Sequence, residues 1–199
     1  MANTLKNIIL EVAADEVMAS GGKSLVLRSV AQRSGTTTQA IYTQFGGKQG
    51  LVEALFNEGW SRLTAELKAL GPKSNPLESL MDIGLCYFRF AHKNPNFYQL
   101  MVGRSVPNIA VPERQNKYTG PWQTFTAVAL NKAISQKLLS GDIEEIGYLL
   151  WATCHGMIDL RINGFVQHND EELLLKKAGI GIFNTFAGPS LTSNLLPNV

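Results

Sequence analysis

The chain has 199 residues, of which 45% are hydrophobic and 17% charged. This composition is typical of a folded globular protein and excludes a disordered or collagen-like chain. A net charge of +2 is too small to indicate a nucleic-acid binder without regard to where the charges lie. The longest apolar-rich run without a charge, residues 146–158, is shorter than the ~20 residues that cross a bilayer. With no secretory pattern at the N-terminus, we expect a cytoplasmic protein without a membrane segment.

Apolar residues recur at helical spacing along the chain, and no sustained strand-like alternation is present. We therefore expect an all-α fold of about nine helices. A first helix is expected over about residues 5–20. The clearest amphipathic repeat follows Asn75-Pro76, a cap and a first-turn proline, and extends to Ala91. A short helix should follow Asn94-Pro95, and others are expected over about residues 122–138, 142–163 and 170–186.

Two short helices joined by a turn are predicted within residues 27–45. Gly35 suits the turn because it adopts a conformation that other residues resist, and Thr37 is placed to cap the second helix. The inward positions are Leu27, Val30 and Ala31 in the first helix and Ile41 and Phe45 in the second. This spacing predicts a helix-turn-helix.

The polar residues of the second helix then point away from the core. Thr38, Gln39, Tyr42 and Thr43 would form a face of hydrogen-bonding groups suited to the major groove of DNA. The alternative is a solvated helical hairpin within a larger α-helical protein.

The positive charge is concentrated in the same part of the chain. Residues 21–50 contain two lysines and two arginines and no acidic residue, which gives +4. Lys48 should begin the next helix, where its ammonium group and backbone N–H groups together attract a phosphate. Arg28, at the start of the first short helix, is placed to reach the DNA backbone or a guanine.

The order of Ala31, Gly35, Tyr42, Phe45 and Lys48 resembles that in the N-terminal DNA-binding domain of TetR-family transcriptional regulators. The family pattern A…GVSxGxxYxHFxxKxxL is matched here by A…GTTTQAIYTQFGGKQGL, and the resemblance covers about residues 5–60. It implies phosphate contacts from Tyr42 and Lys48 and base contacts from Arg28, Thr38, Gln39 and Thr43. Thr37 and Gln44 complete the expected set of DNA-binding residues.

Some residues depart from the family pattern. Thr36 replaces an apolar residue, Gln39 a small one and Gln44 the common histidine, which leaves operator preference open. Leu25, Val26 and Leu27 stand where the family often has threonines.

The resemblance divides the chain into a DNA-binding domain at residues 1–50 and a ligand-binding and dimerisation domain at residues 51–199. Trp151, His155 and Gly156 are similar to the W…HG signature of one TetR subgroup. The helix around them is apolar on more than one face, so both faces must be covered. The resemblance implies that the last two helices form a homodimer interface, suited to a palindromic operator. The alternative is that both faces pack within one chain.

Large apolar side chains in the second part are candidates for the wall of an effector cavity, because such sites are mostly apolar with few polar groups. The candidates are Phe88, Tyr98, Met101, Trp122, Phe125, Trp151 and His155. Each is equally compatible with ordinary core packing. His155 lies one helical turn from both Trp151 and Asp159, which suits either a ligand-sensing group or a satisfied structural histidine.

The chain shows no catalytic motif. His92, His155 and His168 do not group with cysteines or carboxylates at metal-ligand spacing, and neither a metal nor a cofactor is expected. Cys86 and Cys154 lie far apart and suit buried apolar positions. The sequence thus predicts a repressor that a largely apolar small molecule releases from a palindromic operator. The alternatives are a helical ligand-binding protein and an uncharacterised enzyme.

Overall fold

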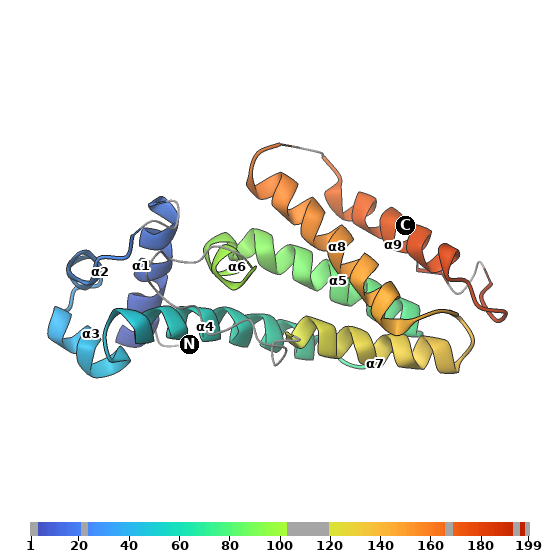
Figure 1. The fold of residues 1–199 in the computed structure, drawn as a ribbon, viewed down its shortest axis with the longest axis horizontal. Coiled ribbons are helices and arrows are strands. Elements are labelled where there is room, and N and C mark those ends of the chain that lie inside the picture. Colours follow the sequence, from blue (N-terminus) through green and yellow to red (C-terminus); the bar gives the residue numbers. More distant parts are fainter. Residues whose placement is uncertain (1–3, 21–23, 103–119, 166–168, 193–195, 198–199) are drawn as a thin grey trace. The chain divides into compact units, whose positions relative to one another are not determined.

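The computed structural model describes residues 4–20, 24–102, 120–165, 169–192 and 196–197. Within these ranges the chain forms nine α-helices and no β-strand, as predicted (Figure 1). The helices are α1 (Leu5–Ala19), α2 (Leu27–Arg33), α3 (Thr38–Phe45), α4 (Lys48–Ala69), α5 (Pro76–Lys93), α6 (Pro95–Val102), α7 (Pro121–Ser135), α8 (Ile143–Ile162) and α9 (Glu171–Thr185).

The predicted helix starts are confirmed by their caps. The Thr37 hydroxyl accepts a hydrogen bond from the N–H of Ala40 at 3.1 Å, and the Asn75 side chain accepts one from the N–H of Leu77 at 2.9 Å. Each bond satisfies a backbone donor that the first turn of a helix leaves without a partner.

The chain divides into two compact units. The first comprises Met1–Arg62 with Asn94–Tyr118, and the second comprises Leu63–Lys93 with Thr119–Val199. The first unit is therefore larger than the expected DNA-binding domain of residues 1–50, since it includes α6 and most of α4.

In the first unit, α1, α2, α3, the first half of α4 and α6 share one core. Ile9, Val30, Ile41 and Leu55 are fully buried within it. Arg62 holds α6 and α1 to α4, because its guanidinium lies 4.2 Å from the ring centroid of Phe97 and 2.6 Å from the Glu11 carboxylate. The core fixes the relative positions of the short helices α2 and α3, which are too short to be stable alone.

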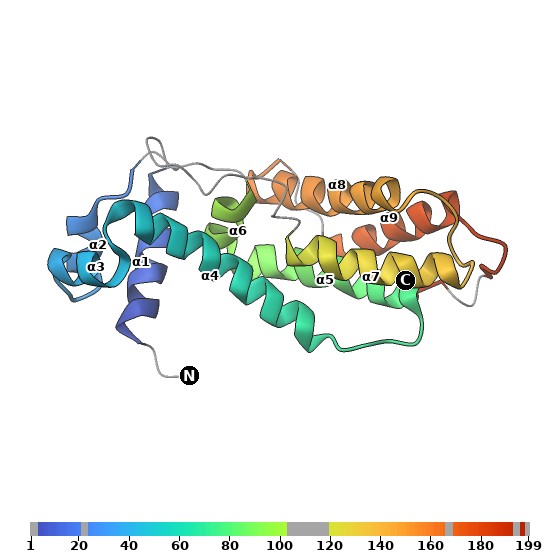
Figure 2. The same ribbon diagram turned by 60° about the horizontal axis from the view of Figure 1, so that its bottom comes forward.

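In the second unit, α5 is the central helix and packs against α7, α8 and α9 (Figure 2). Twelve of its eighteen residues are buried. At Gly84 the two helices α5 and α8 are in contact, since a Cβ there would lie 3.4 Å from the sulfur of Cys154, an ordinary van der Waals distance. At the surface, Arg89 of α5 forms an ion pair with Glu172 of α9. None of the helices described here is both long enough and apolar enough to cross a membrane.

Candidate nucleic-acid interface and regulatory cavities

The turn between α2 and α3 is closed by its backbone. Gly35 has φ +67°, in the left-handed region that glycine tolerates, and the N–H of Thr36 donates to the carbonyl of Ala31 at 2.9 Å. Thr37 then caps α3, so three consecutive residues set the angle between the two helices. The predicted helix-turn-helix is present.

One side of α3 is buried and the other faces outward. Ile41 is fully buried and Phe45 is packed partly against the same core. Gln39, Tyr42, Thr43 and Gln44 are exposed, with Tyr42 at 52%, and Thr38 is half-buried. The Thr43 hydroxyl donates to the carbonyl of Gln39 at 3.0 Å, so it offers a partner its lone pairs and its methyl group. The predicted outward orientation is thus confirmed for Gln39, Tyr42 and Thr43, whereas Thr38 is partly covered.

The α3–α4 junction holds Tyr42 and Lys48 in place through three glycines. Gly46 ends α3 with φ +74°, and Gly47 follows with φ +108°. A Cβ on Gly47 would lie 3.0 Å from the ring of Tyr42, so the ring lies directly over this glycine. A Cβ on Gly50 would lie 1.8 Å from the carbonyl oxygen of Phe45, which leaves no room for any side chain.

The positive charges around α3 differ in their partners. Arg33 lies 3.9 Å from Asp15 and 3.6 Å from Glu16 of α1, so part of its charge is compensated within the protein. Arg28 and Lys48 form no ion pair with any residue that the structure describes. These two cations are therefore available to phosphates. Lys23 lies outside the described residues.

Glu16 of α1 supports the start of α2, a role that sequence reasoning did not identify. Val26, the N-cap residue of α2, has no side chain that can cap the helix. Glu16 replaces that cap, because its carboxylate accepts a hydrogen bond from the N–H of Val26 at 2.9 Å and another from the hydroxyl of Ser29. The carboxylate is 12% exposed and lies at the positive end of the helix dipole.

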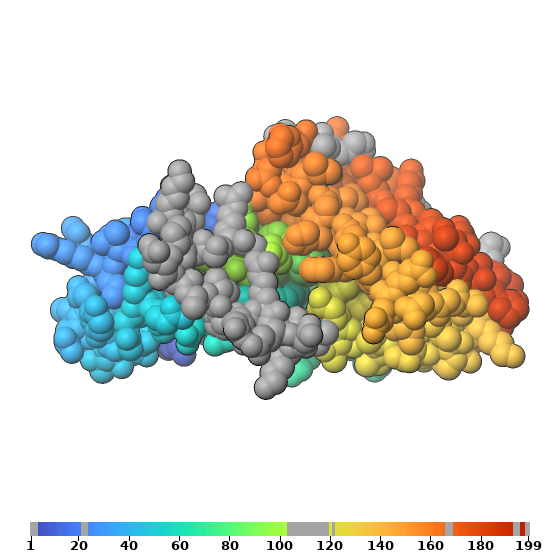
Figure 3. Space-filling view, in the orientation of Figure 1, coloured from blue at the N-terminus to red at the C-terminus, as the bar shows by residue number. Residues whose placement is uncertain are grey.

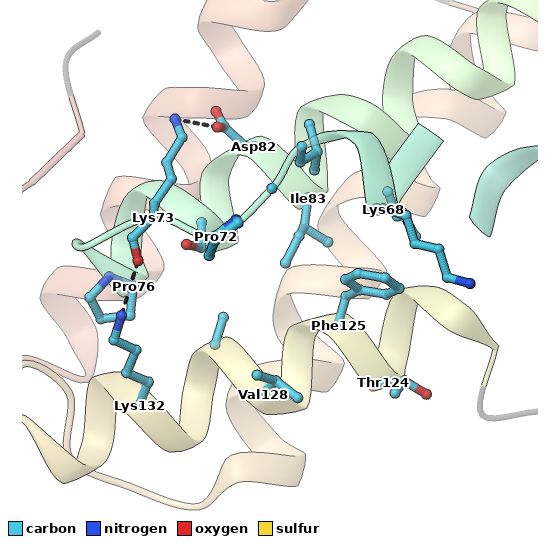
Figure 4. Close-up of a pocket in the computed structure, with 15 residues that line it drawn as sticks. Lys68, Pro72, Lys73, Pro76, Asp82, Ile83, Thr124, Phe125, Val128 and Lys132 are labelled. Carbon is cyan, nitrogen blue, oxygen red and sulfur yellow. Dashed lines mark hydrogen bonds and ion pairs between the residues drawn. The ribbon is translucent and has the colours of Figure 1, made fainter. Parts of the chain in front are cut away.

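A cleft of about 540 Å³ opens in the second unit among the end of α4, the α4–α5 loop, α5 and α7. In Figure 4, Ile83 points into it from α5, and Phe125 and Val128 point into it from α7. Asp82 forms an ion pair with Lys73 at its edge, and Lys68 and Lys132 also line it. The volume is within the usual range for small-molecule sites.

A second cavity of about 300 Å³ lies between α7 and α8. Trp122 and Trp151 line it together with Thr126. The indole N–H of Trp122 and the hydroxyl of Thr126 are buried and have no hydrogen-bond partner in the described structure.

The structure does not bring the seven candidate effector residues into one cavity. Phe125 lines the α4–α5–α7 cleft, whereas Trp122 and Trp151 line the α7–α8 cavity. Phe88 is core and lies 4.3 Å from the ring of His92, measured between centroids. Tyr98 and Met101 are buried in the first unit. The ring of His155 lies tilted against that of Trp151, with 5.5 Å between the ring centroids.

Burial shifts the pKa values of titratable groups on α8 and α5. Desolvation lowers the pKa of His155, partly offset by the negative charge of Asp159. Burial raises the pKa of Cys154 to about 12, and that of Cys86 on α5 to about 11, so both thiols stay protonated at neutral pH. Neither thiol is activated as a nucleophile. No group of three or more metal-ligating side chains occurs among the residues described.

The outer faces of α8 and α9 carry an apolar strip with small residues. The two helices lie side by side at the surface (Figure 3). On α8, Leu149, Ala152, Gly156 and Leu160 are exposed, and on α9 Leu174 and Gly181 are exposed. A Cβ on Gly156 or Gly181 would meet nothing within 4 Å, so both glycines leave open space for another helix.

Two family models match the chain. Residues 9–55 match the model described as bacterial regulatory proteins, tetR family, and residues 80–175 match the model described as tetracyclin repressor-like, C-terminal domain. The first match covers the helix-turn-helix, and the second covers α6 and parts of α5 and α9, with α7 and α8 between them. A comparison with curated proteins gave no significant match.

Solved structures share the fold along nearly the whole chain. A protein of unknown function from Rhodococcus sp. RHA1 is 23% identical, with a TM-score of 0.74 over 92% of this chain and 95% of that one. The TetR-family transcriptional regulator PfmR from Thermus thermophilus is 20% identical, with a TM-score of 0.72 over 88% and 97%. The TetR-family protein CprB from S. coelicolor A3(2) is 19% identical, with a TM-score of 0.70 over 94% and 91%.

Proposed function

Because the chain belongs to the TetR family of DNA-binding transcriptional regulators, we propose that it is a repressor that a small molecule releases from a palindromic operator. Regulators of this family bind DNA and act as dimers. They are not enzymes, which matches the expectation from sequence.

The observation that carries the DNA-binding proposal is the face of α3. Its exposed polar side chains stand opposite the buried Ile41, and Arg28 and Lys48 carry charges that the described protein does not compensate. We assign Gln39, Thr38, Thr43 and Arg28 to base edges, since amide, hydroxyl and guanidinium groups read bases in the major groove. Tyr42 and Lys48 hold phosphates, and Thr37 and Gln44 complete the contact surface.

The dimer pairs the exposed strips of α8 and α9 with their symmetry mates. The supporting observation is the line of exposed Leu149, Gly156 and Leu160 on α8, which would stay in contact with water in a single chain. Small residues let facing helices approach closely. A twofold pair of α3 helices then matches an operator with two half-sites one helical turn apart.

Release follows from competition between two spacings of the α3 helices. An effector in the second unit favours one spacing and the operator favours the other, so each weakens the affinity of the other by the same factor. Equal effector affinity with and without operator would contradict this mechanism.

The experiment measures the affinity of the full-length protein for its own upstream DNA and for random duplex at two salt concentrations. The proposal predicts a preference for the upstream DNA of about 10³-fold or more. Lys48→Ala should weaken binding to both duplexes and lower the slope of log affinity against log salt by about 1. Gln39→Ala should cost ~1–3 kcal/mol on the upstream DNA and little on random duplex.

Matched controls separate specific contacts from general changes of charge or polarity. Lys93→Ala removes a lysine on α5 that is paired with Glu66 at 3.5 Å, and it should change neither affinity. Gln136→Ala removes an exposed glutamine at the end of α7. If Gln39→Ala loses the same factor on both duplexes, Gln39 does not read bases.

A further inference from the structure

We infer that the α4–α5–α7 cleft binds an amphipathic anion, a molecule with an apolar body and a carboxylate or phosphate end. The inference deepens the proposed function and rests on it in one respect, namely that occupation of the cleft changes operator binding.

The apolar body of the ligand is inferred from the side chains that line the cleft. Leu67, Ile83, Phe125 and Val128 are among the apolar residues that line the cleft. Val128 is 68% exposed, which leaves a β-branched side chain in water at the mouth of the cleft. An apolar ligand would remove this surface from water, which favours binding.

The anionic end of the ligand is inferred from the charged residues that line the cleft. Three lysines and one aspartate line the described part of the cleft, which gives 3 − 1 = +2. Lys73 is committed to Asp82, and this pairing raises the pKa of Lys73. Lys132 donates to the backbone carbonyl of Lys73 at 3.0 Å, a neutral acceptor that leaves its charge uncompensated. Lys68 forms no ion pair with a described residue.

The two uncompensated cations lie at different ends of the cleft. In Figure 4, Lys132 lies beside Pro76, and Lys68 lies beyond Phe125 on the other side. A ligand whose apolar body fills the space between them can place its anionic head against either ammonium group. A cationic head would meet like charge at both ends, which disfavours it.

The position of the cleft offers a route to the DNA. Its wall includes the last turn of α4, and α4 begins at Lys48, directly after the recognition helix α3. Because a helix transmits displacement along its length, a ligand that separates the end of α4 from α7 also acts on the helix that carries Lys48. This connects the cleft to the proposed release.

The experiment compares straight-chain ligands that each contain eight carbon atoms and carry different heads. Octanoate, octyl phosphate, octanol and octylamine are titrated into the full-length protein by calorimetry, each below its self-association concentration. The two anions should bind about tenfold more tightly than octanol, and octylamine should bind more weakly than octanol. The ratio of octanoate to octyl phosphate then distinguishes a carboxylic acid from a phosphate ester as the natural class.

Variants test the charges with opposite signs. Lys132→Met and Lys68→Met keep an unbranched apolar side chain. At least one of them should lower the affinity for octanoate about fivefold while leaving the affinity for octanol unchanged. Asp82→Asn releases Lys73 from its ion pair and should raise the affinity for octanoate about threefold. Lys177→Met removes an exposed lysine of α9 outside the cleft and should have no effect. Thr126→Val, in the α7–α8 cavity, should also have none.

Equal affinity for all four heads, or octanoate binding that is insensitive to both lysine variants and to Asp82→Asn, would overturn the inference. Loss of octanoate binding in Thr126→Val would place the ligand in the α7–α8 cavity and also overturn it. Operator affinity, measured in parallel, separates the two proposals. Lysine-dependent octanoate binding that leaves operator affinity unchanged supports the ligand class and contradicts release through the cleft.

Discussion

The first unit positions its candidate DNA-binding residues through local backbone features, whereas the candidate sites of the second unit are spaces and surfaces between helices. In the first unit, Gly35, Thr37 and Gly46 each fix one turn or cap, and the exposed face of α3 follows from them. In the second unit, the cleft exists because α4, α5 and α7 do not meet completely.

This difference teaches how each unit can change. A recognition surface set by turns tolerates new outward side chains, because Gln39 or Gln44 is replaceable without altering the turn. A cleft or an interface set by packing shifts whenever a helix moves, which is the behaviour that the proposed response to a ligand requires. Substitutions can therefore show whether the first unit is as strictly defined as its glycines indicate, and whether the second depends on its exposed surfaces.

The largest effect is expected at the α3–α4 junction. In Gly50→Ala the new Cβ would lie 1.8 Å from the backbone oxygen of Phe45, and a backbone cannot rotate away as a side chain does. We expect a loss of about 3 kcal/mol or more in the free energy of unfolding, together with loss of DNA binding. Thermal unfolding and operator titration measure both.

Gly59→Ala on the same helix is the matched control. Its Cβ would lie 2.6 Å from the sulfur of Met101, a flexible side chain that can change rotamer. We expect a much smaller loss of stability. Equal losses in the two variants would show that the α3–α4 junction adapts to a side chain and is not strictly defined by its glycines.

The second prediction concerns the surface of α8. Gly156→Arg places a long cation where a Cβ meets nothing within a single chain, so the helix itself should fold normally. In a dimer through α8 and α9 the charge would be buried, and we expect dimer affinity to fall by at least about 2 kcal/mol. Sedimentation over a range of concentrations measures this. Gln136→Arg is the control, and an unchanged dimer in Gly156→Arg would move the interface elsewhere.

The third prediction concerns the cap supplied from α1. Glu16→Ala leaves the N–H of Val26 and the hydroxyl of Ser29 without their shared acceptor. We expect a loss of about 1–2 kcal/mol in the free energy of unfolding. In a double-mutant cycle, Ser29→Ala should cost less in the Glu16→Ala background than in the wild type. Additive costs would mean that the two side chains do not interact.

These residues show what could be predicted from the sequence. The helix-turn-helix was predictable because Gly35, Thr37 and the spacing of Ile41 and Phe45 are local signals. The role of Glu16 was not, because it depends on how α1 packs against α2, and Val26 gives no sign that its N–H is capped from another helix.

The cavities were less predictable for a related reason. Large apolar residues at helical spacing indicate burial, but they do not distinguish filled space from empty space. Phe88 and Tyr98 fill the core, while Phe125, with the same kind of side chain, lines the cleft. The lysines that give the cleft its charge come from α4, the α4–α5 loop and α7, and only the fold brings them together.

The smallest effect is expected at His155. Its pKa is lowered in the folded protein because burial disfavours the charged form, so the folded state favours the neutral ring. The unfolded state therefore binds more protons as pH falls through the ordinary value of about 6.5, and stability should fall with it. Because the ring is only half-buried, we expect a loss below about 1 kcal/mol between pH 8 and about pH 5.5.

His155→Gln removes the titrating ring and keeps a polar side chain, so the difference in unfolding free energy between the two pH values should shrink relative to the wild type. Comparing the two proteins at both pH values cancels the titration of carboxylates common to them. A pH dependence that is identical in the variant would show that His155 contributes nothing to it. A pH dependence of the unfolding free energy that grows with protein concentration in the wild type alone would place His155 in the dimer interface. There the partner's helices would increase its burial.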